Sequence, residues 1–141
     1  MSRVYWDTML FIYWLEDNPH YAKRVSQIRT RMKERRDQLL TGAFTFGEVL
    51  AGVYRRRDAQ RAAEVRVLLR GSVAEILPFD LETADHYAQI RARLEVTPVD
   101  ATHLAVAAQD GTDLFLTNDN RLVGKFVPGI QFIASINDNV I

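Results

Sequence analysis

The sequence predicts an α/β fold in which a central, mostly parallel sheet of five strands lies between two layers of helices. Short apolar segments with strand character alternate along the chain with longer segments of helical periodicity. Such alternation is typical of parallel strands joined by helices that cover both faces of a sheet. The chain has 141 residues, and a domain of that size buries about 68–70% of its unfolded surface. We therefore expect one domain over residues 1–141.

The first third of the chain is expected to hold a strand and two helices. Arg3–Trp6 is a short apolar run that predicts the first strand, and Thr8–Glu16 is apolar enough for a buried helix. Asn18-Pro19 interrupts the chain and precedes a long polar helix, about His20–Leu40. Its apolar and long side chains recur near the helical period; they are Val25, Ile28, Met32 and Leu39.

The middle of the chain is expected to begin with a second strand, Ala43–Phe46, that leads into a helix carrying Glu48. The charged run Arg55–Asp58 ends this helix, and a further helix covers Ala59–Arg70. Gly71 is the stop signal of that helix. A third strand follows at Val73–Leu77.

The last part of the chain carries the clearest helix signals. Asp80 is expected to cap a helix at about Leu81–Leu94, and Thr97-Pro98 places a capping residue before a proline at the first helical position. That second helix is expected to run to Gln109, with Gly111 as its stop. The remaining expected elements are a fourth strand, a short turn or helix and a fifth strand, at Leu114–Thr117, Asn120–Val123 and Ile130–Ala134.

Composition excludes several classes of protein. The chain has no cysteine, which excludes disulfides and thiolate metal sites and suits a reducing, cytoplasmic location. The longest apolar run, Met9–Leu15, is far shorter than the roughly 20 residues of a membrane helix. The formal net charge is zero, but residues 21–70 carry 13 Lys and Arg against 5 acids, and residues 71–141 carry 4 against 10. A basic surface that holds phosphates beside an acidic cluster that holds metal would suit a nuclease, although Lys23–Arg36 also fits a solvated helix face.

Four acids stand in matching local settings, either after an expected strand or at the start of a helix: Asp7, Glu48, Asp100 and Asp119. The carboxyl ends of parallel strands share one edge of the sheet, where ligands bind. Asp100 follows no strand, but its helix ends where the fourth strand begins. A helix of about 12 residues spans roughly 18 Å, so its start reaches the same edge. We therefore expect all four acids to meet there.

Each acid also has a structural explanation. Asp7 could cap the first helix, and Asp119 could cap the turn that follows it. Glu48 and Asp100 each stand three residues after a threonine, Thr45 and Thr97, which is the capping-box spacing. Four carboxylates at one edge would nevertheless repel each other, and a divalent cation would supply the missing charge. The pattern therefore favours a metal-dependent hydrolase that cuts nucleic acid.

Other candidate ligands fit less well. Asp113 precedes its strand, Asp110 lies in the last turn of a helix and Asp80 fits a helix cap. His103 is the one histidine near a candidate acid, and a single histidine on an apolar helix is typical of a packed core. The sequence has no zinc-binding spacing of Cys and His. All-oxygen ligands favour Mg²⁺ or Mn²⁺.

Four segments together resemble the PIN-domain family, in particular the VapC-type toxins of bacterial toxin–antitoxin pairs. They are Asp7-Thr8 after the first strand, Thr-Phe-Gly-Glu-Val-Leu-Ala-Gly around Glu48, Asp-Ala-Thr-His-Leu-Ala at 100–105 and Leu-Thr-Asn-Asp-Asn-Arg-Leu at 116–122. No segment is specific alone, but their order, spacing and setting are. The resemblance covers residues 4 to about 133 and implies a single PIN domain with a three-layer α/β/α fold.

The resemblance also implies an activity. Asp7, Asp100 and Asp119 would be the main ligands of Mg²⁺ or Mn²⁺, Glu48 would complete the catalytic pocket, and Thr117 would support the last aspartate. The protein would then be an endoribonuclease whose metal-activated water hydrolyses a phosphodiester of tRNA, rRNA or mRNA, leaving a 5′-phosphate and a 3′-hydroxyl. Basic residues of Lys23–Arg36 and Arg55–Arg57 would hold the RNA backbone.

The implied partners are an antitoxin that keeps the enzyme inactive and a second copy of the chain in a homodimer. Aromatic residues near Phe11, Trp14 and Tyr54 could form such an interface, or they could belong to the core. Three other functions remain open on the sequence alone. They are a PIN nuclease of RNA maturation outside a toxin–antitoxin pair, a receiver-like signalling domain that binds Mg²⁺, and a metal-binding scaffold without turnover.

Overall fold

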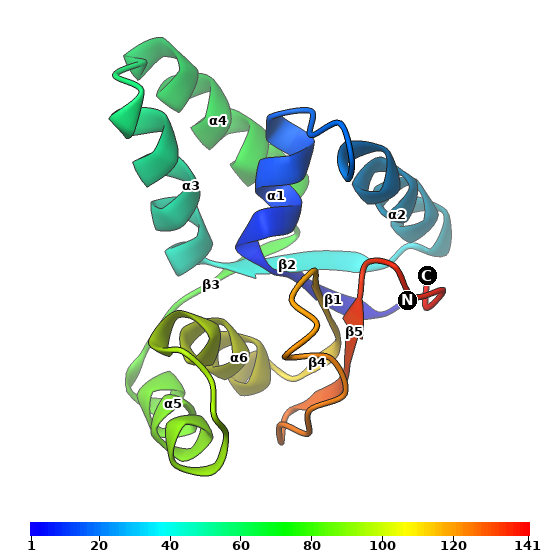
Figure 1. Ribbon diagram of the computed structural model, residues 1–141, viewed down its shortest axis with the longest axis vertical. Coiled ribbons are helices and arrows are strands. Elements are labelled where there is room, and N and C mark those ends of the chain that lie inside the picture. Colours follow the sequence, from blue (N-terminus) through cyan, green and yellow to red (C-terminus); the bar gives the residue numbers. More distant parts are fainter.

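The computed structural model describes residues 1–141 and has five strands and six helices (Figure 1). The strands are β1 (Arg3–Trp6), β2 (Gln38–Gly42), β3 (Glu75–Leu77), β4 (Thr112–Thr117) and β5 (Ile130–Ser135). The helices are α1 (Thr8–Leu15), α2 (Ala22–Arg35), α3 (Ala43–Arg55), α4 (Ala59–Ser72), α5 (Leu81–Arg93) and α6 (Pro98–Asp110). None of them is both long and apolar enough to cross a membrane.

The five strands form one sheet in the order β3-β2-β1-β4-β5, and every neighbouring pair is parallel. The central strand β1 pairs with β2 on one side, where Val4 faces Leu39, and with β4 on the other, where Val4 faces Leu114. The chain builds outward from β1 in one direction and then in the other. The topological switch point, where ligands bind in such sheets, therefore lies between β1 and β4.

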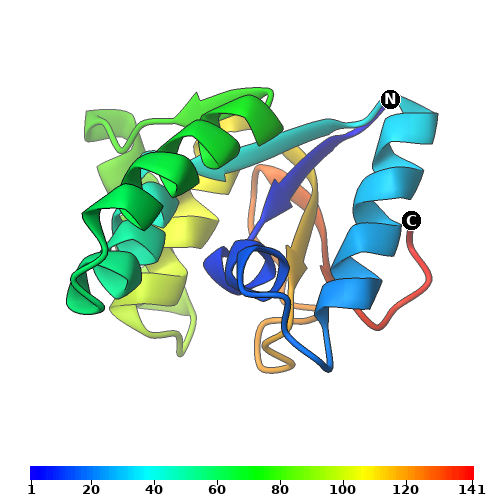
Figure 2. The ribbon, with the colours of Figure 1, turned by 90° about the horizontal axis from the view of Figure 1, so that it is seen from above.

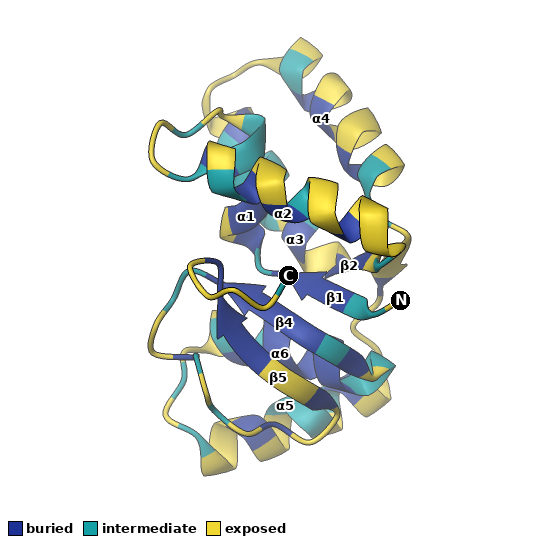
Figure 3. Ribbon diagram, turned by 90° about the vertical axis from the view of Figure 1, so that its right-hand side faces the viewer, coloured by how far each residue is buried: buried dark blue, intermediate teal, exposed yellow.

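Helices cover both faces of the sheet, so the expected three-layer fold is confirmed (Figure 1). Helices α1–α4 lie on one side and α5 and α6 on the other. Alternating side chains of β1 enter the two cores: Val4 and Trp6 pack with α1–α4, and Tyr5 packs with α5 and α6. The central strands β1 and β4 are almost entirely buried, the edge strand β5 has an exposed stretch, and the outer helix faces are exposed (Figure 3). Both chain ends lie beside α2 (Figure 2).

Two boundaries in the first half of the chain differ from the sequence prediction. The expected helix His20–Leu40 ends at Arg35, and Gln38–Gly42 forms β2. The expected strand Ala43–Phe46 is the first turn of α3, which places Glu48 in the second turn of that helix and not directly after a strand. The helix stop is hard to read because Arg36, and not a glycine, adopts the left-handed conformation there (φ 60°).

The strand order also decides between two of the predicted functions. Receiver domains are built on a doubly wound sheet in the order 2-1-3-4-5. Here β2, and not β1, stands next to β3, and β4 pairs directly with β1. The receiver-like alternative is therefore wrong.

Candidate functional site

Asp7 and Asp119 follow the two strands that flank the switch point. Asp7 comes directly after β1, and its backbone N–H donates to the carbonyl of Leu116 in β4 (3.0 Å). Asp119 lies two residues beyond the end of β4, and its backbone N–H donates to the hydroxyl of Thr117 (3.0 Å). The same hydroxyl donates to Asp7 Oδ2 (2.8 Å). Thr117 thus links the two acids at this edge of the sheet.

Glu48 and Asp100 reach the same edge from helices in opposite layers. Glu48 belongs to α3, whose first residues continue from the end of β2. Asp100 lies in the first turn of α6, where the Thr97 hydroxyl accepts its backbone N–H (3.1 Å). Proline at the first position of α6 helps to fix this start.

One cavity of about 520 Å³ brings the four acids together. Its lining consists of Asp7, Thr8, Met9, Ile12, Tyr13, Glu48, Val99, Asp100, His103, Asn118, Asp119 and Asn120. The acids come from four segments that are far apart in sequence. All four are half-buried, so water or a substrate can still reach them.

The Asp7 carboxylate is poorly compensated. Burial raises its pKa above the ordinary value, and the nearby charge of Asp100 acts in the same direction. His103 and the hydrogen bond from Thr117 act against this rise without cancelling it. Asp7 occupies the N-cap position of α1, but its side chain makes no capping hydrogen bond. Capping therefore does not explain Asp7.

Asp119 is compensated by a neighbour in its own loop. The Arg121 guanidinium donates from Nε to Oδ1 (3.0 Å) and from Nη2 to Oδ2 (2.7 Å). These hydrogen bonds hold the pKa of Asp119 below its ordinary value. Oδ1 also accepts the Arg121 backbone N–H (3.0 Å), so the expected capping of the following turn is confirmed for this acid.

Glu48 is held by two buried side chains. Its Oε1 accepts from the Thr8 hydroxyl (2.5 Å) and lies 2.7 Å from Nε2 of His103. Burial works against ionisation of Glu48, but the hydrogen bonds from His103 and Thr8 outweigh it, and its pKa lies below the ordinary value. The capping-box explanation is wrong for Glu48, because α3 begins at Ala43 and Thr45 is buried inside it.

The remaining acids lie where the sequence predicted them. Asp80 caps α5 in a reciprocal box with Thr83. Asp113 and Asp110 both contact Arg3, at the start of β1 and so at the opposite edge of the sheet. Neither of the latter two can join the cavity.

Some polar residues at the site were not predicted to have a role there: Thr8, His103 and Asn118 line the cavity, and Arg121 holds Asp119 from beside it. His103 is buried, as expected of a core histidine, but it also hydrogen bonds to Glu48. Asn118 donates to the Tyr13 hydroxyl (3.0 Å) in the cavity wall. The one available signal was spacing: His103 stands one helical turn after Asp100 and Arg121 two residues after Asp119.

The donor set suits a hard divalent cation. The four acids offer only carboxylate oxygens, and the buried charge of Asp7 lacks a full counter-charge. In this arrangement no three acidic or histidine side chains stand close enough together to hold a metal. Arg121 holds Asp119, and Thr8 and His103 hold one oxygen of Glu48. The donor chemistry fits Mg²⁺ or Mn²⁺, and Asp119 would have to release Arg121 in order to hold the ion.

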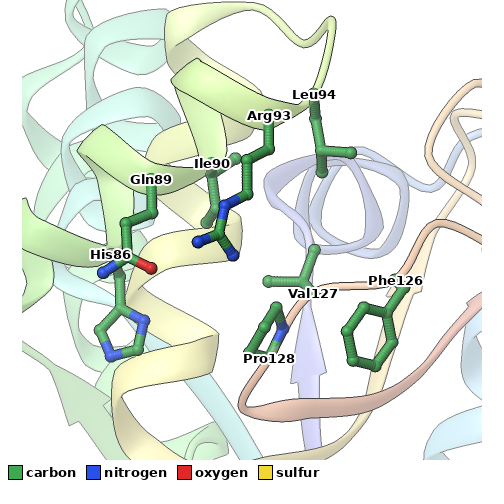
Figure 4. A pocket seen from close by; sticks show the side chains of 8 residues that line it. All are labelled: His86, Gln89, Ile90, Arg93, Leu94, Phe126, Val127 and Pro128. Atoms are coloured by element: carbon green, nitrogen blue, oxygen red, sulfur yellow. The ribbon is translucent and has the colours of Figure 1, made fainter.

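A second cavity, of about 120 Å³, lies between α5 and the β4–β5 connection (Figure 4). Its lining is His86, Gln89, Ile90, Arg93, Leu94, Phe126, Val127 and Pro128. Its lining contains no carboxylate, the ligand that Mg²⁺ and Mn²⁺ prefer.

Comparison with known families gives the class of the protein. A family model of the PIN domain matches residues 4–124, and the chain belongs to this family. PIN domains are nucleases, so the class is that of hydrolases that act on nucleic acid. A comparison with curated protein sequences finds no match.

Several solved structures have the same fold. VapBC2 from Rickettsia felis, bound to a promoter DNA fragment, has a chain with a TM-score of 0.75 at 14% identity, over 94% of this chain and 97% of that one. A chain of DNA-bound VapBC from Salmonella typhimurium has a TM-score of 0.69 at 21% identity, and the match covers 96% of this chain and 99% of that one. A chain of a toxin–antitoxin complex from Klebsiella pneumoniae has a TM-score of 0.67 at 18% identity, and the match covers 92% of this chain and 95% of that one. At these identities the likeness shows the fold.

Proposed function

We propose that the chain is an endoribonuclease that depends on Mg²⁺ or Mn²⁺ and acts as the toxin of a toxin–antitoxin pair, in a single domain over residues 1–141. One observation carries the catalytic part of the proposal: four carboxylates from separate segments line one cavity at the switch point of a PIN fold. The toxin role is supported by the likeness to chains of VapBC and other toxin–antitoxin complexes.

In this proposal Asp7, Asp100 and Asp119 hold the cation. A bound divalent ion lowers the pKa of a coordinated water and stabilises negative charge on a phosphate. Thr117 keeps the Asp7 carboxylate in place through its hydrogen bond to Oδ2. Glu48 is kept ionised by Thr8 and His103, so it can accept a proton from the attacking water. Attack by water leaves a 5′-phosphate and a 3′-hydroxyl.

Exposed basic side chains support the proposal of a polyanionic substrate. Arg55 is the last residue of α3, the helix that carries Glu48, and Arg57 lies in the turn that follows; both are exposed. Arg56 between them pairs with Glu16. Further exposed basic residues lie along α2, among them Lys23, Arg31 and Lys33. Single-stranded or looped RNA is proposed as the substrate because its bases and backbone are accessible.

An antitoxin is the proposed inhibitor, and a groove supports its binding. The groove, about 120 Å³, lies between α1, α3 and α4 and includes Glu48 and apolar residues such as Ile12, Val49 and Val53. Of the aromatic residues expected at an interface, Tyr54 is exposed, Trp14 is half-buried beside Arg29, and Phe11 belongs to the core. The proposed homodimer rests on the family resemblance.

Cleavage of labelled single-stranded RNA tests the catalytic proposal. The purified chain is incubated with Mn²⁺, with EDTA, and with EDTA followed by excess Mn²⁺. We expect the RNA to be cleaved with Mn²⁺, to stay intact with EDTA, and to be cleaved again when excess Mn²⁺ follows EDTA. The products should have 5′-phosphate ends. Cleavage that persists in EDTA, or products with 2′,3′-cyclic phosphate ends, would exclude the proposed mechanism.

Expression in a bacterial host tests the toxin role. The chain alone should stop growth, and co-expression of a small protein encoded beside its gene should restore it. Growth unaffected by a chain that cleaves RNA in vitro would favour a role in RNA maturation.

A further inference from the structure

A series of hydrogen bonds between buried polar side chains leads to Glu48. The Tyr5 hydroxyl lies 2.8 Å from Nδ1 of His103, and Nε2 of His103 lies 2.7 Å from Glu48 Oε1. Tyr5 is fully buried and His103 is 2% exposed. These hydrogen bonds cross the sheet edge, because Tyr5 belongs to the core with α5 and α6 and His103 lies in α6, while Glu48 comes from α3 in the other layer.

The hydrogen-bonding capacities of these groups place a proton on Nε2 of His103 and indicate how a neutral ring meets Tyr5. An ionised carboxylate can only accept, so both neighbours of Glu48 Oε1 must donate to it, Thr8 from its hydroxyl and His103 from Nε2. A neutral imidazole protonated at Nε2 has a lone pair at Nδ1, and this nitrogen accepts the Tyr5 proton. The proton position on a histidine is set by the hydrogen bond at its other nitrogen.

Packing keeps the Tyr5 hydroxyl in place. The ring stacks on Phe115 with centroids 5.1 Å apart. Gly42, at the end of β2, leaves room for the hydroxyl, since a Cβ there would lie 3.1 Å from it. The phenol is therefore held against Nδ1 by its surroundings.

We propose that Tyr5 and His103 are positioning residues of the active site: Tyr5 fixes the Nε2–H tautomer of His103, which pins Glu48 through Oε1. Glu48 Oε2 makes no hydrogen bond with the protein and remains available at the cavity. The role of Glu48 in catalysis rests on the proposed function, but the tautomer does not. The two parts can therefore be tested separately.

Nitrogen-15 NMR of the metal-free protein tests the tautomer. The His103 signals are assigned by their loss in His103→Ala. We expect a ring protonated at Nε2 alone in the wild type, and a mixture of tautomers in Tyr5→Phe, which keeps the stacked ring but loses the donor. A wild-type ring protonated at Nδ1, alone or together with Nε2, would overturn the proposal, and so would a tautomer unchanged in Tyr5→Phe.

RNA cleavage tests the positioning of Glu48. Tyr5→Phe should lower kcat about tenfold with KM unchanged, the scale of effect seen for residues that orient a catalytic group. In a His103→Ala background the same change should alter kcat less than twofold, because Tyr5 acts on Glu48 only through His103. Tyr87→Phe, which removes a hydroxyl on α5, is the matched control and should leave kcat unchanged.

The outcomes separate the two proposals. An equal loss from Tyr5→Phe in both backgrounds would overturn the positioning role. If the wild type does not cleave RNA at all, the proposed function fails, while the NMR measurement still decides whether Tyr5 sets the tautomer. Thermal melting of each variant confirms that it is folded.

Discussion

At the residue scale, three acids of the cavity are compensated in different ways. Asp119 pairs with the Arg121 guanidinium, and Glu48 accepts hydrogen bonds from Thr8 and His103. Asp7 has a single side-chain donor, Thr117, and burial raises its pKa. In the folded protein without a cation, the negative charge of Asp7 is therefore destabilised by burial and by repulsion from Asp100. A cation bound at Asp7 would relieve this destabilisation.

Asp7→Asn should stabilise the metal-free protein by a few degrees at pH 7. Above the raised folded pKa, Asp7 is ionised in both states and burial penalises only the folded one. Below the ordinary unfolded value of 3.8 it is protonated in both states, and the penalty disappears. The gain should therefore shrink as the pH falls toward 4. Thermal unfolding in EDTA measures it.

Asp80→Asn is the control for this experiment. Hydrogen bonds within the α5 cap lower the pKa of Asp80, so its charge favours the folded state at neutral pH and stops doing so in acid. This change should not raise the melting temperature. A melting temperature of Asp7→Asn below that of the wild type in EDTA would show that its charge is well compensated.

Arg121→Ala should raise the affinity for Mn²⁺ about two- to fivefold. The side chain of Arg121 is 77% exposed, and an exposed ion pair contributes about 0.2–1 kcal/mol. A cation that binds Asp119 must break this ion pair, so removing the arginine should favour cation binding by that amount. Isothermal titration calorimetry measures the affinity. Arg31→Ala, on the exposed face of α2, should leave it unchanged. Weaker Mn²⁺ binding in Arg121→Ala would mean that the arginine helps to organise the site.

The sequence was sufficient to predict that the four acids meet at one edge of the sheet, but not most of the hydrogen bonds that they make there. Acids after parallel strands share an edge whatever the details of packing, so Asp7 and Asp119 could be placed from strand order alone. The contact between His103 and Glu48 depends on how α6 and α3 meet across the edge, 55 residues apart in sequence. No periodicity within either helix encodes that contact.

At the element scale, the junction between α6 and β5 depends on one glycine. Gly129 has φ 99°, and a Cβ at this position would lie 2.4 Å from the carbonyl oxygen of Ala108 in the last turn of α6. Its own carbonyl accepts the N–H of Thr112 at the start of β4 (2.9 Å). This contact fixes the far end of the helix that carries Asp100.

Gly129→Ala should destabilise the fold by at least about 2 kcal/mol, since it combines a clash with backbone and a strained φ. Gly47→Ala is the matched control. This helical glycine has open space around its Cβ position, so the change should raise the free energy of unfolding by about 0.5–1 kcal/mol. Urea unfolding measures both. Equal stability of the two variants would contradict this account of the junction.

Element boundaries could be predicted where the chain carries a standard signal. Thr97-Pro98 and Asp80 mark the starts of α6 and α5 as expected. The predicted end of α2, and with it the position of β2, was wrong because Arg36 takes the left-handed position that glycine usually occupies after a helix. Leu39 and Leu40 then extend the apolar pattern of α2 without a break.

At the scale of the whole molecule, topology carries the functional argument. The order β3-β2-β1-β4-β5 puts the ends of β1 and β4 side by side, and α3 and α6 start near that edge from opposite layers. Acids separated by as many as 112 residues thereby line one cavity. The alternation of strands and helices predicted the layers, whereas the order of the strands needed the structure.

RNA cleavage by single acid variants tests the central claim, that the four acids form one catalytic site. Asp7→Asn, Glu48→Gln, Asp100→Asn and Asp119→Asn are compared with the wild type and Asp80→Asn, on single-stranded RNA with Mn²⁺. Each cavity variant should lose at least about 100-fold in rate, and Asp7→Asn/Asp119→Asn should lose little more than either change alone. Asp80→Asn should cleave like the wild type. A folded Asp7→Asn or Asp119→Asn protein that cleaves as fast as the wild type would contradict the claim.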